Sequence, residues 1–333
     1  MVDKIDLVYM WVDGNDSEWR KTKNHWLQEV KGKVIVNADS AVDARWRDND
    51  ELKYALRSAE KYVPWINHIY LITGFGQVPS WLDTSNPKIT VIPQETIMPK
   101  ESQPTFNSVS IEMCLMNIPG LSEHFLLSND DMLFNRPLKP DFFFDKRGRA
   151  IVWYLKHRHI KNVGFDLERI STDYRKTILV ALHKIRTIFG LKKKYLCYIP
   201  SHNVDPYIKS SMIACRNHPL LIRDFDAQIR NKFRTSWEMQ RWVFSMYDFV
   251  HKRAVLRRTR RFKQRKHFLY NLIFYRSCKN SSMYCVDAVA EGIERINPPL
   301  FCINDTVLST DAMRKSNADF LAKKFPEKSS FEK

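Results

Sequence analysis

Two acidic turns follow short apolar runs, and they are the first places in this sequence where chemistry could be done. The turn from Asp13 to Asp16 comes directly after residues 5–11, and Asp130-Asp131 closely follows residues 125–127. Hard cations such as Mg²⁺ take oxygen ligands, usually one or two carboxylates together with water and substrate phosphate. These acidic strand ends are therefore a candidate metal and nucleotide-diphosphate site. An aspartate after a strand is also ordinary turn chemistry, so neither turn alone decides.

Three further side chains could act on a phosphate group. Histidine titrates near pH 6.5, so His202 could be a general base, although a lone histidine more often has a structural role. Arg234 directly precedes residues 235–238, a T-x-x-E pattern that predicts a helix start, and a guanidinium beside a helix N-terminus would clamp an anion. Its alternative is an ordinary surface arginine. Glu112 lies inside a predicted helix and could be a base, a support for a metal ligand or a solvated charge.

The elements around these residues predict an α/β fold with a largely parallel sheet. Apolar or β-branched runs at residues 5–11, 68–73, 89–92 and 125–127 predict strands. Asp48 and Glu51 resemble a capping box and predict a helix that Pro64 ends, and a second helix is predicted near residues 109–117. Ligands bind beyond the carboxyl ends of the strands in an open parallel sheet, and both acidic turns fall at such ends.

The pattern changes after about residue 145. Longer helical patterns and denser positive charge predict a helical, basic insertion or subdomain over 146–295, with helices at 167–191, after His218 and after Thr235. A last helix is predicted from about Asp311 to Phe325. We therefore divide the chain into an α/β core at 1–145, the basic region at 146–295 that carries His202 and Arg234, and a C-terminal segment at 296–333.

The composition describes a long, strongly basic chain that can bury a large core. Its 333 residues include 54 Lys and Arg against 37 Asp and Glu, a net charge of +17, and 44% of them are hydrophobic. These values exclude disordered, collagen-like and low-complexity classes. No apolar run approaches the roughly 18 residues of a membrane span and no signal-peptide pattern follows Met1, so we expect a cytoplasmic protein. The six cysteines form no C-x-x-C pair, which indicates reduced, mostly buried thiols.

Several common enzyme motifs are absent from the sequence. The segment 74–76 (GFG) lacks the third glycine of a dinucleotide-binding loop, and there is no G-x-x-x-x-G-K-[ST] phosphate loop. Neither H-E-x-x-H nor G-x-S-x-G occurs. Dinucleotide-dependent, P-loop, zinc-protease and serine-hydrolase chemistries therefore lose their main support.

Five long blocks of the sequence carry a specific pattern. The blocks are IDLVYMWVDGND (5–16), RWRDNDELKYALRSAEKYVPWINHIYLITGFGQVPSWL (45–82), PTFNSVSIE (104–112), LSEHFLLSNDDMLF (121–134) and FCINDT (301–306), followed by a C-terminal KKFPEKSSFE. In this order they closely resemble the Stealth family, which includes bacterial capsular and exopolysaccharide phosphotransferases and the catalytic subunit of the animal N-acetylglucosamine-1-phosphotransferase. Such long, tryptophan-rich blocks are far more specific than any short motif.

The resemblance implies a glycosyltransferase-A-like, Rossmann-type fold and transfer of a sugar-1-phosphate from a UDP-sugar to an acceptor hydroxyl, with release of UMP. N-acetylhexosamine is the family's usual sugar, and a divalent cation, Mg²⁺ or Mn²⁺, is expected. By position, the resemblance assigns roles as follows: catalysis to Glu112, Asp131, His202 and Arg234; donor binding to Asp13, Gly14, Asn15, Arg47, Asn49 and Arg234; metal binding to Asp130, Asp131, Asn304 and Asp305.

These roles lead to expectations about mechanism and partners. His202 is expected to take the proton of the acceptor hydroxyl, with Glu112 as its orienter or rival, while Arg234 and the cation neutralise phosphate charge. The acceptor is expected to be a glycan, lipid-linked or part of an anionic polymer, and the 1–145 core to bind the nucleotide sugar. The basic segment 252–266 would attract such an acceptor at the inner face of the plasma membrane, without specific nucleic-acid binding. The 296–333 segment is expected to return to the active site.

Two alternatives remain open. An ordinary metal-dependent glycosyltransferase would share the fold, the cation and the donor, but it would attack the anomeric carbon and release UDP. A non-enzymatic polyanion-binding protein would account for the positive charge but not for the acidic strand ends.

Overall fold

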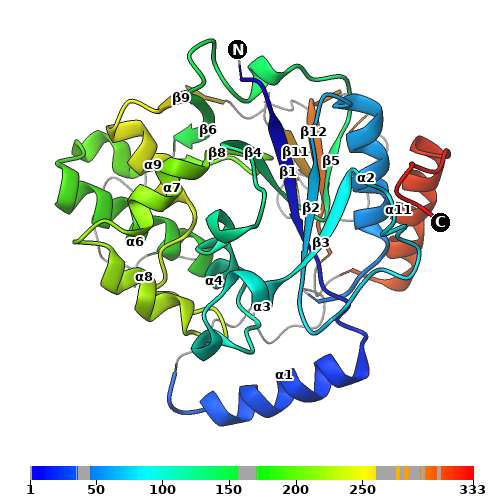
Figure 1. Ribbon diagram of the computed structural model, residues 1–333, viewed down its shortest axis with the longest axis horizontal. Coiled ribbons are helices and arrows are strands. Elements are labelled where there is room, and N and C mark those ends of the chain that lie inside the picture. Colours follow the sequence, from blue (N-terminus) through cyan, green and yellow to red (C-terminus); the bar gives the residue numbers. More distant parts are fainter. Residues whose placement is uncertain are drawn as a thin grey trace.

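A five-stranded sheet forms the centre of the molecule in the computed structural model, which describes residues 2–34, 36, 46–156, 170, 172–259, 275–277, 281–284, 293, 297–305 and 309–333. The strands lie in the order β3-β2-β1-β4-β8 (Figure 1). Strands β1 to β4 run parallel, and β8 joins β4 antiparallel. The predicted α/β class with a mostly parallel sheet is confirmed. The bounds are β1 Ile5–Met10, β2 Ile69–Thr73, β3 Ile89–Pro93, β4 His124–Asn129 and β8 Asp205–Ile208.

Two smaller sheets flank the central one. The first has the order β10-β11-β12-β5, with β5 Met132–Phe134, β10 Tyr275–Ser277, β11 Ser281–Tyr284 and β12 Leu300–Ile303. The second has the order β7-β6-β9, with β6 Ala150–Lys156, β7 Tyr198–Pro200 and β9 Ala254–Arg258. The prediction of a helical region over 146–295 is therefore wrong in one respect, because this region contributes strands to all three sheets. The boundaries of the three segments stay a prediction.

Helices lie on both sides of the central strands. Helices α6 to α9 gather at one side, α2 and α11 lie together at the other, and α1 runs along the lower edge of the view in Figure 1.

In the described part of the chain, no helix combines the length and apolar character needed to cross a membrane. The α-helices are α1 Ser17–Val30, α2 Glu51–Tyr62, α3 Gln94–Ile97, α4 Ser108–Glu112, α6 Asp173–Phe189, α7 Lys209–Arg216, α8 Ile222–Ile229, α9 Trp242–Val250 and α11 Asp311–Lys324; the 3₁₀ turns are η3 Lys100–Ser102, η4 Leu115–Asn117, η5 Pro140–Phe142 and η7 Lys193–Cys197.

The two predicted capping boxes are both wrong. Helix α2 begins at Glu51, and Asp50 occupies the N-cap position without a capping hydrogen bond from its side chain. The Glu51 carboxylate accepts hydrogen bonds from the backbone N–H and the side-chain amide of Asn49. Helix α9 begins only at Trp242. The Glu238 carboxylate accepts from the Thr235 backbone, as a capping box requires, but it also accepts from the side chains of Asn107 and Asn231, and no helix starts at Thr235. Helix α1, which the sequence analysis missed, is capped by Asp16, whose carboxylate accepts from Trp19 N–H at 2.7 Å.

The apolar runs become strands because the central sheet is covered on both faces. Leu7, Val8 and Tyr9 are fully buried, as expected of a parallel strand between two helical layers. Asp6 is buried with them, and its carboxylate accepts from Asn67 Nδ2 and Ser122 N–H, each at 2.7 Å.

The described cysteines confirm the prediction of buried thiols. Those that the structure describes, Cys114, Cys197, Cys215 and Cys302, are buried and free, whereas Cys278 and Cys285 lie outside the described residues.

Candidate active site

The strand order places the two acidic turns at the same edge of the central sheet, where the order of the strands reverses. The chain proceeds from β1 through β2 to β3 in one direction and then returns to place β4 on the other side of β1. Ligands bind at such a switch point, beyond the carboxyl ends of the two strands. Met10 pairs with Asn129 in the β1–β4 register, so Asp13 follows one strand and Asp130-Asp131 follows its neighbour at the same edge. The predicted location of both turns is confirmed.

Two distant segments reach the end of β4 through strand pairing. Strand β8 pairs antiparallel with β4, so its first residue, Asp205, lies beside Leu127, and the loop that holds His202 extends beyond the carboxyl end of β4. Strand β12 pairs antiparallel with β5, which follows Asp131 directly, and Cys302 lies opposite Met132. The backbone N–H of Ile303 donates to the Asp131 carbonyl at 3.1 Å. Both segments therefore place a side chain beside Asp131.

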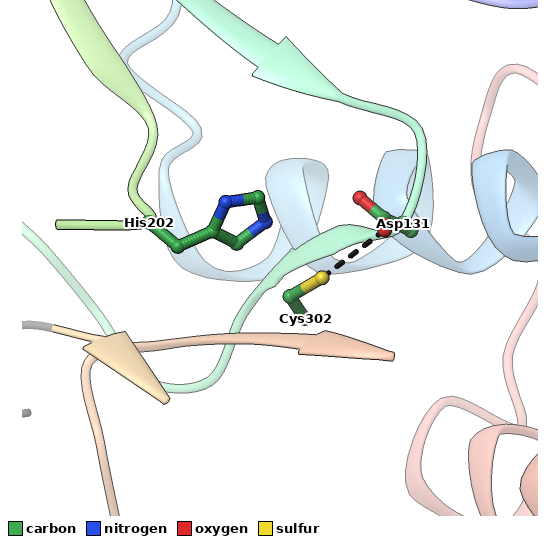
Figure 2. A group of neighbouring side chains, drawn as sticks. All are labelled: Asp131, His202 and Cys302. Atoms are coloured by element: carbon green, nitrogen blue, oxygen red, sulfur yellow. Dashed lines mark hydrogen bonds between the residues drawn. The ribbon is translucent and has the colours of Figure 1, made fainter. Parts of the chain in front are cut away.

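Asp131, His202 and Cys302 form one compact group. Their ligand atoms all lie within 4.8 Å of one another. The Cys302 thiol donates to Asp131 Oδ2 at 3.1 Å, and the imidazole of His202 points toward both of them in Figure 2. Cys302 is buried, whereas Asp131 and His202 are half-buried. The structure thus brings together two predicted catalytic residues that are 71 positions apart in the sequence, and it adds a cysteine that the sequence analysis did not consider.

Further carboxylates surround Asp130. Burial, together with the charges of Asp131, Glu51 and Asp48, raises the pKa of Asp130 well above its ordinary range. Burial also raises the pKa of Asp48, and it raises that of Glu51 to about 7 despite the bonds from Asn49. Carboxylates that repel one another in a buried place favour either protons or a cation. The spacing of Asp48 and Glu51 resembles a helix cap, so no local pattern indicated that they belong to this site.

Replacing Glu51 by glutamine is expected to stabilise the protein at high pH. The folded-state pKa of about 7 exceeds the ordinary 4.5, so Glu51 is destabilising above pH 7, and this cost disappears as the pH falls from 7 to 4.5. Glu51→Gln should raise the free energy of unfolding by up to about 3 kcal/mol at pH 8 and leave it nearly unchanged at pH 4.5. Urea unfolding at both pH values measures this, with Glu29→Gln on α1 as the control. Equal pH dependence in Glu51→Gln and wild type would contradict it.

The predicted donor-binding turn is held in a single conformation. Gly14 N–H donates to the Trp46 carbonyl at 2.8 Å, and a Cβ on Gly14 would lie 2.0 Å from that oxygen. No other residue therefore fits at this position without moving the segment that leads to Asp48. The side chain of Gln77 binds the backbone of Asp13 through two hydrogen bonds of 3.0 Å: Oε1 accepts from the Asp13 N–H, and Nε2 donates to the Asp13 carbonyl. The side-chain oxygen of Asn15 accepts a hydrogen bond from Arg20 Nη2 at 3.1 Å.

Glu112 forms a buried ionic network that the sequence did not reveal. Arg241 Nη1 lies 2.8 Å from Glu112 Oε1, and its Nη2 lies 3.1 Å from Asp205 Oδ2. All three side chains are at most 13% exposed. Burial raises the pKa of Asp205 to about 6, although the Arg241 charge opposes that shift. Of the options for Glu112, a solvated charge is excluded, and the ion pair favours an orienting role.

Arg234 does not immediately precede the start of helix α9, so the predicted helix N-terminus directly after it is wrong. Helix α9 starts eight residues later, and the Arg234 guanidinium instead donates to the Ser108 hydroxyl at the start of α4. Beside it, Phe233 stacks on Phe106 with a ring separation of 5.2 Å. The segment around Arg234 is thus attached to the helix that carries Glu112. A catalytic or donor-binding role for Arg234 stays a prediction.

Asp305 already has two cationic partners. Arg47 Nη1 and Arg314 Nε each lie 3.0 Å from Asp305 Oδ2. Burial acts to raise the pKa of Asp305, but hydrogen bonds from Arg314, Ser309 and Arg47 hold it below the ordinary value. Because two guanidiniums neutralise this carboxylate, Asp130 and Asp131 are the better predicted metal ligands. Asp305 also lines a small recess, together with Asn49, Glu51, Ile303, Ser309, Arg314, Asn317, Ala318 and Leu321.

Comparisons with known proteins agree with the sequence blocks. Residues 3–28 match the model of Stealth protein CR1, conserved region 1, and residues 45–152 match that of Stealth protein CR2, conserved region 2. The capsular polysaccharide phosphotransferase WcwK of Streptococcus pneumoniae is 31% identical over the whole of both chains. The exopolysaccharide phosphotransferase cps2G of Lactiplantibacillus plantarum is 30% identical over 99% of this chain and 96% of that protein.

Among solved structures, galactosyltransferase LgtC in complex with donor and acceptor sugar analogs superposes with a TM-score of 0.42 and 11% identity, over 98% of this chain and 97% of that one. A similarity at that level does not bear on the assignment, so the glycosyltransferase-A-like fold stays an expectation from the family resemblance. The sheet, its acidic strand ends and the full-length relatives define this protein as a transferase. The chain belongs to the Stealth family.

Proposed function

We propose that this protein transfers a sugar-1-phosphate, with N-acetylhexosamine as the sugar, from a UDP-sugar to a hydroxyl of a glycan acceptor in capsule or exopolysaccharide synthesis. The observation that carries the proposal is the meeting of Asp131 and His202 within 4.8 Å at the switch point of the sheet. The names of the full-length relatives, both phosphotransferases of extracellular polysaccharides, support it.

The acidic residues fit a divalent cation. Asp131 Oδ1 is buried and has no hydrogen-bond partner among the described residues, and Asp130 stands beside it under strong repulsion from neighbouring carboxylates. Oxygen donors of this kind suit Mg²⁺ or Mn²⁺. Asp130 and Asp131 would hold the ion, which when bound neutralises charge on the phosphate oxygens of the donor.

The protein's own residues would position the reactants and move one proton. The acceptor oxygen attacks the β-phosphorus of the donor, the bond from that phosphorus to the bridging oxygen breaks, and UMP departs. His202 accepts the proton of the attacking hydroxyl, and Arg234 binds phosphate oxygens. Glu112, held by Arg241, orients the α4 segment to which Arg234 is attached.

Product analysis tests this function directly. Purified protein with UDP-N-acetylglucosamine, Mg²⁺ and acceptor oligosaccharides should yield UMP and a phosphodiester detected by ³¹P NMR. Asp131→Asn, an isosteric change, should abolish both products. Release of UDP with a glycosidic product would instead establish the ordinary glycosyltransferase, and product formation that is unchanged in Asp131→Asn would refute the assigned site.

We further propose that the protein acts at the cytoplasmic face of the membrane on an anionic or lipid-linked acceptor. Lys252, Arg253, Arg257 and Arg258 are exposed at and beside β9, while residues 260–266 of the basic segment lie outside the described residues. Binding to anionic vesicles should weaken steeply between low and high salt. Co-sedimentation measures this, with neutral vesicles as the control. Salt-independent binding, or a preference for oligonucleotides over vesicles, would contradict it.

A further inference from the structure

The group around Asp131 contains donor atoms that a magnesium site does not need. It presents a carboxylate oxygen, an imidazole nitrogen and a thiol sulfur, all within 4.8 Å of one another. Mg²⁺ and Ca²⁺ take oxygen ligands, whereas a mixed set of nitrogen, oxygen and sulfur is typical of Zn²⁺ and of its spectroscopic substitute Co²⁺. The group therefore differs in kind from the carboxylate pair Asp130-Asp131.

The geometry is close to that of a three-ligand zinc site. Zn²⁺ binds sulfur at about 2.3 Å and nitrogen or oxygen at about 2.0–2.2 Å, so tetrahedral donors lie roughly 3.3–3.8 Å apart. Cys302 Sγ lies 3.1 Å from Asp131 Oδ2, slightly closer than that range, and the remaining donors need to approach by at most about 1.5 Å, within the reach of side-chain rotation. The three residues come from the β4–β5 turn, the β7–β8 loop and β12, which the strand pairing holds in place.

We propose that Asp131, His202 and Cys302 form a binding site for a thiophilic divalent cation of the Zn²⁺ class, with one coordination position left open. Binding replaces the thiol proton that Cys302 now shares with Asp131, so one proton is released for each ion bound. Because Asp131 and His202 are only half-buried, the site is reachable from solvent.

Occupation of this site would block transfer, and this consequence rests on the proposed function. A ring nitrogen that coordinates Zn²⁺ has no lone pair left to accept a proton from the acceptor hydroxyl. Asp131 would also be withdrawn from Mg²⁺. The protein should therefore be inhibited by Zn²⁺ in the presence of excess Mg²⁺, and a chelator should restore its activity.

A cobalt titration tests the site without relying on activity. The full-length, metal-free protein is titrated with Co²⁺ and then with Zn²⁺, while absorption and proton release in weak buffer are recorded. We expect one Co²⁺ per chain with a sulfur-to-cobalt charge-transfer band, displacement by Zn²⁺, and one proton released per ion. Cys302→Ser should lose the band and bind Zn²⁺ at least about 10- to 100-fold more weakly, the cost of disturbing even an indirect partner.

Cys197→Ser is the matched control. Cys197 is equally buried, and its thiol donates to the Lys194 carbonyl, outside the cluster, so this variant should keep the band. A wild-type cobalt spectrum without a sulfur band, or equal Zn²⁺ affinity in Cys302→Ser and wild type, would overturn the inference. The wild-type spectrum decides even if Cys302→Ser does not fold. Absence of UMP formation would refute the proposed function but leave the metal titration unaffected.

Discussion

His202→Ala is expected to lower kcat by about 10²- to 10⁴-fold, the usual contribution of a general base. The imidazole lies beside Asp131 at the carboxyl end of β4, where the proposed function places the acceptor hydroxyl next to the donor phosphate. Removal of the base should leave the KM for the UDP-sugar nearly unchanged, because the base acts on the attacking group and not on the donor. Initial rates of UMP release at saturating substrates measure this effect.

The control for this experiment is His25→Ala, which removes an exposed histidine from α1. It should retain wild-type kinetics. If His202→Ala kept near-wild-type kcat, His202 would not be the base. A parallel rise in the donor KM with unchanged kcat would instead assign His202 to donor binding.

Arg241→Met is expected to lower the free energy of unfolding by about 3–5 kcal/mol. The guanidinium is 11% exposed and pairs with Glu112 and Asp205, whose side chains are 6% and 13% exposed. Its removal leaves two buried carboxylates without a cation, which costs far more than the pair itself contributes. Urea unfolding at pH 8, followed by circular dichroism, measures the change, and kcat should fall as α4 loses its anchor.

A matched control separates this effect from the loss of any arginine. Arg230 approaches Glu101 at 3.9 Å with both side chains more than half exposed, so Arg230→Met should cost about 1 kcal/mol or less. Adding Glu112→Gln and Asp205→Asn to Arg241→Met should recover part of the lost stability, because burying a neutral amide has a smaller free-energy penalty than burying an unpaired charge. Equal destabilisation by the two single arginine variants would show that the Arg241 network has no special role.

Much of the fold could be predicted from local patterns. The runs that became β1 to β4 are apolar because a parallel strand is covered on both faces, and short-range chemistry alone favours strands there. The acidic turns after β1 and β4 were placed correctly for the same reason, since a strand end followed by aspartates needs no tertiary information. Helix α11 was predicted almost to its ends.

Local patterns failed where another segment competes for the same side chain. Residues 235–238 match a capping box, and Glu238 does accept from the Thr235 backbone, yet Asn107 and Asn231 also bind its carboxylate and the helix begins only at Trp242. Glu51 likewise matched a cap but belongs to the carboxylate cluster around Asp130. A short motif reports only on hydrogen bonds between residues close in sequence. It does not include a bond such as that from Asn107 to Glu238, which lie 131 positions apart.

The sequence by itself determined the α/β class, the acidic strand ends and the family, because these depend on periodicity and on residue types in order. Only the tertiary structure decided which side chains meet. The antiparallel pairing of β8 with β4 places His202 near Asp131, and that of β12 with β5 places Cys302 there. Arg241 reaches Glu112 in the same way, across 129 positions. Such contacts follow from strand register and packing, which no local spacing encodes.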